Sequence, residues 1–229
     1  MPEIYHVLNR GVDKRKIFLN DQDHFRFVHD LYEFNDANPV NNVVYYFQKF
    51  NDVGRPYIRP YVRKKQPREP IIDIHAFCLM PNHYHLLISP RVESGISLFM
   101  KKLNGGYAKY FNEKYERSGA LFQGRYKSIV VIEESHFIHL PYYIHCNPLD
   151  IVGEQWRIRK TNDYRSAINF LESYRWSSHL DYLGEKNFPS VITNSFLQNY
   201  FGGDLAYKKT IYKWLKDFDL EIISSVALE

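Results

Sequence analysis

The order of strand-like and helix-like segments predicts an α+β protein built on an antiparallel βαββαβ plait of the ferredoxin-like type. β-prone and amphipathic segments follow one another as strand, helix, strand, strand, helix, strand, helix. The chain turns at Pro81-Asn82 between the second and third strands, which is typical of an antiparallel hairpin. After Pro148 the chain is rich in aromatic residues and short helical patterns, and we expect a helical C-terminal extension packed on the plait.

Each expected element has a local signal. Residues 4–9 are β-prone and end at Arg10-Gly11, and Asp21 is expected to cap a helix that continues to about residue 37. Asn147 ends the last helix of the plait, because the residue before a proline disfavours helical backbone. The other plait strands are expected at residues 72–79, 83–89 and 125–132, and the other plait helices at about 94–115 and 133–146. In the extension, helices are expected at residues 167–183, 196–201 and 205–218.

Residues 38–70 interrupt the plait. Residues 43–50 are β-prone, but the prolines that follow break any regular element. We interpret this segment as an inserted, basic, hairpin-like excursion. Residues 1–150 are therefore expected to form one domain with an insertion at about 38–70, and residues 151–229 its extension. Between positions 55 and 68 the insertion has no acidic residue and six basic ones, namely Arg55, Arg59, Arg63, Lys64, Lys65 and Arg68.

Composition limits the class of protein. The chain has 229 residues, and its apolar runs are too short to span a membrane, which needs about 20 residues. The N-terminus lacks the pattern of a secretory signal, and the two cysteines form no CxxC pair, so we expect a protein of the reducing cytoplasm. A net charge of +4 and 17% aromatic residues favour a nucleic-acid partner. The alternative is that the aromatics form the core and the basic residues a solvated loop.

His83 and His85 are the first candidate site residues. They stand one residue apart on an apolar, β-prone segment, so both side chains lie on the same face of a strand. Two Cβ atoms about 6–7 Å apart on one face can hold a divalent ion between them. The competing interpretation is that one histidine packs in the core while the other hydrogen bonds to a loop.

Tyr143 and Asn147 form a second candidate group, in the run from Pro141 to Pro148. At the end of a helix their i, i+4 spacing places them on one face, where a phenol and an amide oxygen can serve as nucleophile and metal ligand. Tyr142 is the rival nucleophile but lacks this spacing to Asn147. Asn147 can also be a simple helix C-cap, and His145 can be structural.

These two runs carry a family resemblance. Residues 80–88, Met-Pro-Asn-His-Tyr-His-Leu-Leu-Ile, resemble the HUH signature of the single-tyrosine transposases. Residues 143–148, Tyr-Ile-His-Cys-Asn-Pro, resemble the helix that carries their catalytic tyrosine. The chain is similar to the insertion-sequence-200-like members of this family from about residue 4 to 183. Further matches lie at residues 5–11, 121–128 and 174–178, the last of which resembles a patch of the REP-associated tyrosine transposase branch.

The resemblance implies a metal-dependent DNA transposase that nicks and rejoins single-stranded DNA with hairpin (palindromic) ends. Tyr143 would form a covalent 5′-phosphotyrosine, and His83, His85 and Asn147 would bind Mg²⁺ or Mn²⁺. Tyr84 occupies the middle of the HUH triplet and is expected to point away from the metal. His6 and Asn9 on the first strand are open candidates for the same face. The basic residues expected to contact DNA are Arg10, Arg55, Arg59, Arg63, Lys64, Lys65, Arg125 and Lys127.

Two other functions stay open at this point. One is a domesticated single-stranded nucleic-acid-binding protein without transposition activity, and the other is a metal-dependent phosphohydrolase that uses water and has no need of Tyr143. The target DNA sequence is not predicted, nor is the choice between a monomer acting in cis and a homodimer completing each site in trans. The long extension favours the REP-associated branch.

Overall fold

The computed structural model describes residues 3–38, 67–153, 156–157, 163–217 and 220–228. The β-prone segment 43–50 and the basic residues Arg55, Arg59, Arg63, Lys64 and Lys65 lie outside this part of the chain. Arg68 is described, and it stacks on Tyr32 with its guanidinium carbon 3.6 Å from the ring centroid.

A four-stranded antiparallel sheet forms the centre of the structure. Its strand order is β2-β3-β1-β4, and every neighbouring pair is antiparallel. With one helix between β1 and β2 and another between β3 and β4, this is the topology of the ferredoxin-like plait, so the predicted fold class is confirmed. The strands are β1 (Ile4–Arg10), β2 (Ile72–Met80), β3 (His83–Pro90) and β4 (Lys127–Val131).

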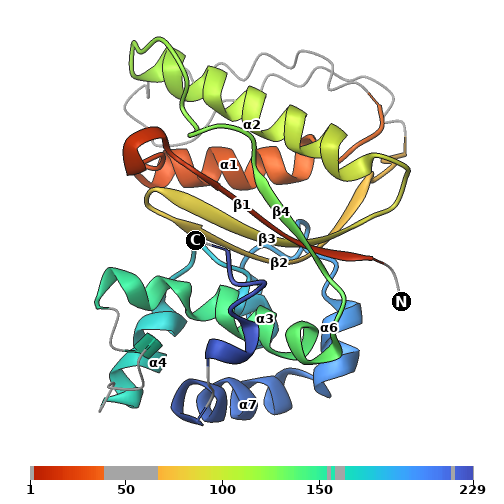
Figure 1. Cartoon of the computed structure of the whole chain (residues 1–229), viewed down its shortest axis with the longest axis vertical. Coiled ribbons are helices and arrows are strands. Elements are labelled where there is room, and N and C mark those ends of the chain that lie inside the picture. The colour runs from red at the N-terminus through yellow and green to blue at the C-terminus, as the bar shows by residue number, and fades with distance from the viewer. Residues whose placement is uncertain (1–2, 39–66, 154–155, 158–162, 218–219, 229) are drawn as a thin grey trace.

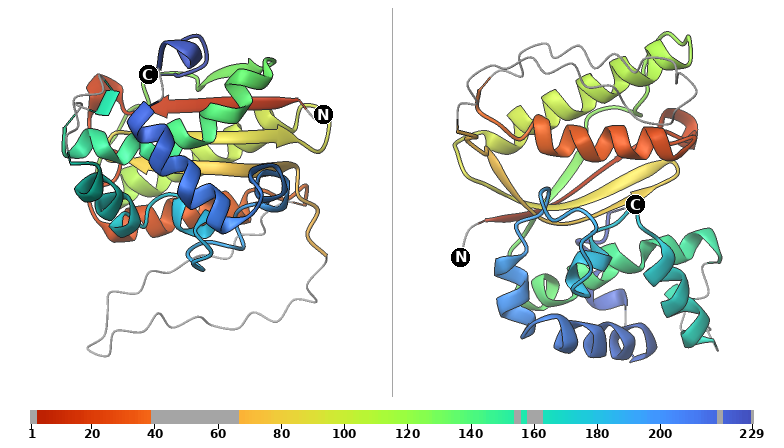
Figure 2. Two further views of the ribbon diagram at one scale, coloured as in Figure 1. Left: turned by 90° about the horizontal axis from the view of Figure 1, so that it is seen from below. Right: turned by 180° about the vertical axis from the view of Figure 1, so that it is seen from behind.

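Helices cover both faces of the sheet (Figure 1). On one face lie α1 (Asp21–Glu33) and α2 (Gly95–Lys114), and on the other lie α3 (Glu134–Cys146), α4 (Tyr164–Ser173), α6 (Ser195–Phe201) and α7 (Asp204–Asp217). The view from behind in Figure 2 shows the same three layers. Because side chains alternate along a strand, each sheet residue belongs either to the α1–α2 face or to the α3 face.

Helix α1 ends four residues earlier than predicted. Asn20 caps its start by accepting a hydrogen bond from the Asp23 N–H at 3.2 Å. At the other end, Asn35 leaves the helix and bonds to the start of β2, where its Oδ1 accepts from the N–H groups of Ile71 and Ile72, both at 3.0 Å. This tertiary contact, which local periodicity does not reveal, prevents a helix through residue 37.

The single helix predicted over residues 167–183 is wrong. The chain forms α4, then an extended stretch, then the short α5 (His179–Tyr182). The stretch pairs with edge strand β2, because the N–H of Leu79 donates to the carbonyl of Trp176 at 2.8 Å and the N–H of Ser178 donates to that of Phe77 at 3.0 Å. An exposed sheet edge offers unpaired backbone N–H and C=O groups. Hydrogen bonding to these groups outweighs the helical tendency of the stretch. Strand β4 is also shorter than predicted and starts at Lys127.

The residues after 150 share the core of the plait. One cluster of buried side chains extends from β1 through α3 into α7. The Tyr207 hydroxyl from α7 lies 2.8 Å from His145 Nδ1 and 2.9 Å from His179 Nδ1. No helix in the described residues has the length and apolar character that crossing a membrane requires.

Candidate active site

His83 and His85 lie on the α3 face of the sheet. They pair with Arg10 and Leu8 of β1, and their rings meet edge to face with centroids 5.0 Å apart. The prediction that the two imidazoles share a face is therefore confirmed. Tyr84 points to the opposite face, where its hydroxyl bonds to Asn104 of α2, so it too lies as predicted.

Both histidines have their Nδ1 atoms engaged. His83 Nδ1 lies 2.6 Å from Asn82 Oδ1, and His85 Nδ1 lies 2.9 Å from His6 Nε2. His85 Nε2 is buried and has no hydrogen-bond partner. A buried imidazole nitrogen without a partner is costly unless something binds it, so this atom is a natural ligand position.

Burial keeps these imidazoles neutral. Desolvation, followed by the charge of nearby Arg10, lowers the pKa of His83 to about 3. Desolvation likewise holds the pKa of His85 well below its ordinary value. Neutral imidazole is the form that binds metal ions.

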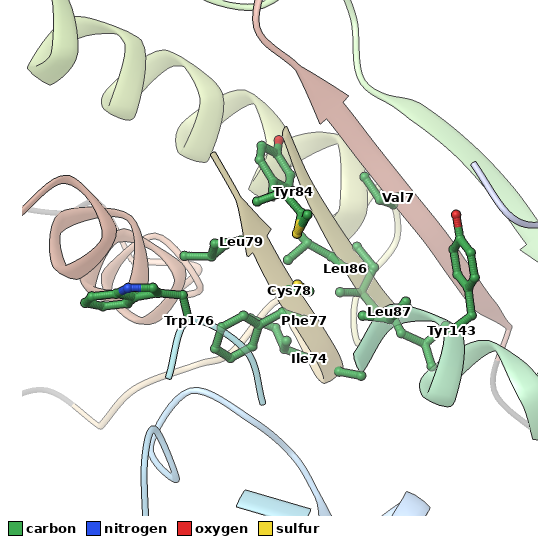
Figure 3. Close-up of a cluster of buried hydrophobic side chains, with 14 of the residues drawn as sticks. Val7, Ile74, Phe77, Cys78, Leu79, Tyr84, Leu86, Leu87, Tyr143 and Trp176 are labelled. Carbon is green, nitrogen blue, oxygen red and sulfur yellow. The ribbon is translucent and has the colours of Figure 1, made fainter. Parts of the chain in front are cut away.

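Tyr143 projects from α3 toward β1 (Figure 3). Its ring stands at 87° to that of His85 with centroids 5.9 Å apart, and at 81° to that of His6 with centroids 6.3 Å apart. The side chain is fully buried, with 0% of its surface exposed. Tyr143 therefore lies against His85, one of the two candidate ligands, as the sequence resemblance implies.

Asn147 lies at the C-terminal end of α3 and is also fully buried. Its Nδ2 donates to the carbonyl oxygen of Tyr143 at 2.9 Å, which is the role of a helix cap. Its Oδ1 accepts from Arg157 Nη2 at 3.4 Å. The amide is thus a structural part of the helix end, and its oxygen keeps a second lone pair available as a ligand.

Arg157 is a residue of this site that the sequence did not indicate. Asp150 holds its guanidinium through two bonds, from Nε at 2.9 Å and from Nη2 at 2.5 Å. The guanidinium carbon lies 5.5 Å from the centroid of the Tyr143 ring. Burial alone would lower the pKa of Arg157, but Asp150 and Tyr143 together raise it above its usual value. The ring of Tyr143 therefore lies beside a permanent positive charge.

The candidate ligands His83, His85 and Asn147 supply some of the donor atoms that a divalent ion needs. Neutral imidazoles are donors for a divalent ion, and one of the two has a free buried Nε2, while the Asn147 amide oxygen is a donor of the type that Mg²⁺ and Mn²⁺ prefer. In the described part of the chain, no three His, Cys, Asp or Glu side chains group as a metal site.

The remaining predicted DNA contacts divide into three groups. Arg10 and Lys127 lie on β1 and β4 on the α3 face, since they pair with His83 and Leu8 respectively. Arg125 is exposed in the loop before β4, and the five basic residues of the insertion lie outside the described residues. Of the open candidates on β1, His6 shares this face, whereas Asn9 pairs with Tyr84 and lies on the other.

The rival residues have other surroundings. Tyr142 is buried against α7, with its ring stacked on that of Tyr207 at 5.5 Å. His145 bonds to Tyr207 and to the hydroxyl of Ser178, inside the core. Neither faces the histidine pair, so Tyr143 is the tyrosine next to the candidate ligands.

An antiparallel plait with two strand histidines facing a helix tyrosine is the arrangement that the resemblance to single-tyrosine HUH proteins implies. The family model described as "Transposase IS200 like" matches residues 40–147. This stretch contains His83, His85, Tyr143 and Asn147, and the predicted resemblance to the IS200-like transposases is confirmed over it.

A solved structure described as a REP-associated tyrosine transposase bound to a REP hairpin is also similar. The identity is 11%, the match covers 82% of this chain and 83% of that chain, and the TM-score is 0.44. A comparison with curated proteins gives no significant match.

Proposed function

We propose that the chain is a metal-dependent transposase that cuts and rejoins single-stranded DNA through a covalent bond to Tyr143. The observation that supports this most directly is the perpendicular contact of Tyr143 with His85, whose buried Nε2 has no partner. The match to the IS200-like transposase family favours DNA as the substrate. The sequence resemblance implies DNA ends that fold into hairpins.

The proposed step exchanges one phosphate ester for another. The Tyr143 oxygen attacks the scissile phosphorus, an O–P bond forms, and the bond from phosphorus to the 3′ oxygen breaks. The phenol loses a proton and the departing oxygen gains one, which leaves a 5′-phosphotyrosine and a 3′-hydroxyl. Because the ester is retained, attack by another 3′-hydroxyl rejoins the strand without ATP.

Tyrosine needs help to act as a nucleophile, since an unperturbed phenol has a pKa of about 10. A divalent ion held by His83, His85 and Asn147 would neutralise the charge of the scissile phosphate. Arg157 would favour the phenolate, because a nearby cation stabilises the charged form. Asp150 keeps the guanidinium in place.

The buried position of Tyr143 adds a requirement for access. The centroid of the Trp156 ring lies 6.3 Å from that of the Tyr143 ring. Because Tyr143 is fully buried, a phosphate reaches its hydroxyl only after neighbouring side chains shift. We infer that DNA binding displaces Trp156, while the contact with Asp150 keeps Arg157 beside the tyrosine.

The test is covalent capture of DNA. Full-length protein is incubated with labelled single-stranded hairpin DNA and Mn²⁺, and a protein–DNA adduct that resists denaturation is sought. We expect the adduct to disappear with EDTA and in Tyr143→Phe, and to persist in the matched control Tyr142→Phe, whose ring faces α7.

The other outcomes separate the alternatives. Metal-dependent cleavage that survives Tyr143→Phe would indicate a hydrolase that uses water. Binding of DNA without cleavage in the wild type would indicate a binding protein. Either result overturns the proposal.

A further inference from the structure

His6 links the candidate metal site to the end of the described chain. Its Nδ1 lies 2.6 Å from the carbonyl oxygen of Val226, and its Nε2 lies 2.9 Å from His85 Nδ1. The rings of His6 and His85 stack at 21° with centroids 5.1 Å apart. All three groups are buried, with 0% of each histidine and 3% of Val226 exposed.

The positions of the protons follow from these contacts. A carbonyl oxygen only accepts hydrogen bonds, so His6 Nδ1 must carry the proton and donate to Val226. A neutral imidazole has one N–H, so His6 Nε2 is then an acceptor. His85 Nδ1 must therefore donate to His6 Nε2. The Nε2 atom of His85 then carries no proton and keeps its lone pair.

The opposite arrangement is unfavourable. If His6 donated from both nitrogens, it would be a buried cation and His85 Nδ1 would have to accept. The proton of His85 would then sit on Nε2, which is buried and has no acceptor. An unmade hydrogen bond of this kind is destabilising.

We propose that the Val226 carbonyl and His6 form a histidine relay that fixes the tautomer of His85, so that its Nε2 lone pair is available to a metal ion. His6 is then a positioning residue and not a ligand. This inference rests on the proposed function, which makes His85 a metal ligand.

The tautomer of His83 is also fixed, but by an amide side chain and not by a second histidine. Its Nδ1 donates to Asn82 Oδ1 at 2.6 Å, which also leaves Nε2 without a proton. Metal-binding histidines in proteins commonly donate their second N–H to a fixed acceptor, and this orients the ring. The relay does for His85 what Asn82 does for His83.

The tautomers can be measured without metal. Two-bond ¹H–¹⁵N correlation spectra of the metal-free, full-length protein report which ring nitrogen carries the proton, and loss of signals in His6→Gln and His85→Ala assigns the two rings. We expect Nδ1–H in both His6 and His85. An Nε2–H tautomer of His85 would overturn the relay, whatever the protein does with DNA.

Metal affinity gives a second readout. Mn²⁺ binding is followed by the electron paramagnetic resonance of free Mn²⁺ for the wild type, His85→Ala, His6→Leu and His6→Gln. Leucine removes the acceptor from His85 Nδ1, and we expect affinity to fall about 10- to 100-fold, as for other residues that orient a ligand. Glutamine retains an acceptor oxygen and should recover most of the affinity.

The failures are distinguishable. If wild type and His85→Ala bind Mn²⁺ equally, the metal site of the proposed function is wrong, and the spectra still decide the tautomers. If His85→Ala loses binding but His6→Leu does not, the relay is wrong. If His6→Gln binds as poorly as His85→Ala, His6 is itself a ligand and the relay is again wrong.

Discussion

The rings of Tyr143 and His85 meet at 87° with centroids 5.9 Å apart, although they come from a helix and a strand on different parts of the chain. Each is fully buried, and each is also in contact with His6. Three side chains of different elements thus form one compact group on the α3 face.

Arg157→Met should slow formation of the covalent adduct by about 100-fold, because it removes a fixed positive charge beside the Tyr143 ring. Arg157→Lys keeps the charge but loses the two-bond contact with Asp150, so an intermediate rate is expected. Single-turnover rates on the hairpin substrate check this. Equal rates in all three proteins would show that the guanidinium has no part in the step.

Asn147 can be tested as a ligand and as a cap separately. Asn147→Ala should weaken Mn²⁺ binding about tenfold and lower the free energy of unfolding by about 1 kcal/mol. Asn147→Asp keeps an oxygen but loses the N–H donated to Tyr143, so it should recover metal affinity and not stability. Unchanged affinity in the alanine variant would leave Asn147 with the cap role alone.

The free energy of unfolding should decrease below about pH 6.5. Burial lowers the pKa of His179 to about 3 and that of His145 well below its ordinary value. The unfolded chain therefore takes up these protons first as the pH falls, and each group costs about 1.4 kcal/mol per pH unit over this range. Urea unfolding at pH 7, 6 and 5 measures the slope, which should become shallower in His179→Gln. An identical slope in that variant would contradict the assignment.

Asp23 should be a stabilising buried carboxylate between α1 and α2. It accepts bonds from Lys114 at 2.6 Å, from the Tyr115 hydroxyl at 2.7 Å and from the Leu19 N–H at 2.8 Å. Burial raises its pKa, but these partners outweigh burial and lower it. Asp23→Asn should cost about 3 kcal/mol in urea unfolding, since it removes the carboxylate that neutralises Lys114. The double variant with Lys114→Met should lose less than the two single changes combined.

The parts of the fold with local signals could be predicted from the sequence. The β2–β3 hairpin was expected at residues 72–79 and 83–89 and is found within one residue of those limits, because alternation and the Pro81-Asn82 turn are both local. The break between α4 and α5 could not be predicted. It depends on hydrogen bonds between residues 176 and 178 and the edge of β2, about a hundred positions away in the chain.

The candidate site also has residues that the sequence predicts and residues that it does not. Spacing placed His83 with His85 and Tyr143 with Asn147, and the family resemblance brought the two pairs together. Arg157 carries no pattern that would have singled it out, since only its contacts with Asp150 and Tyr143 reveal it. The partner of His6 lies 220 residues further along the chain, beyond the reach of any periodicity.

That last contact sets an order of events during synthesis. A ribosome releases β1 early, but His6 cannot meet the carbonyl of Val226 until the rest of the described chain has emerged. The plait can fold first, since all its strands precede residue 132. In a nascent chain the sheet would therefore be folded while the tautomer of His85 is not yet fixed. Under the proposed relay, the emergence of Val226, and not the folding of the sheet, would fix the proton on His85 Nδ1.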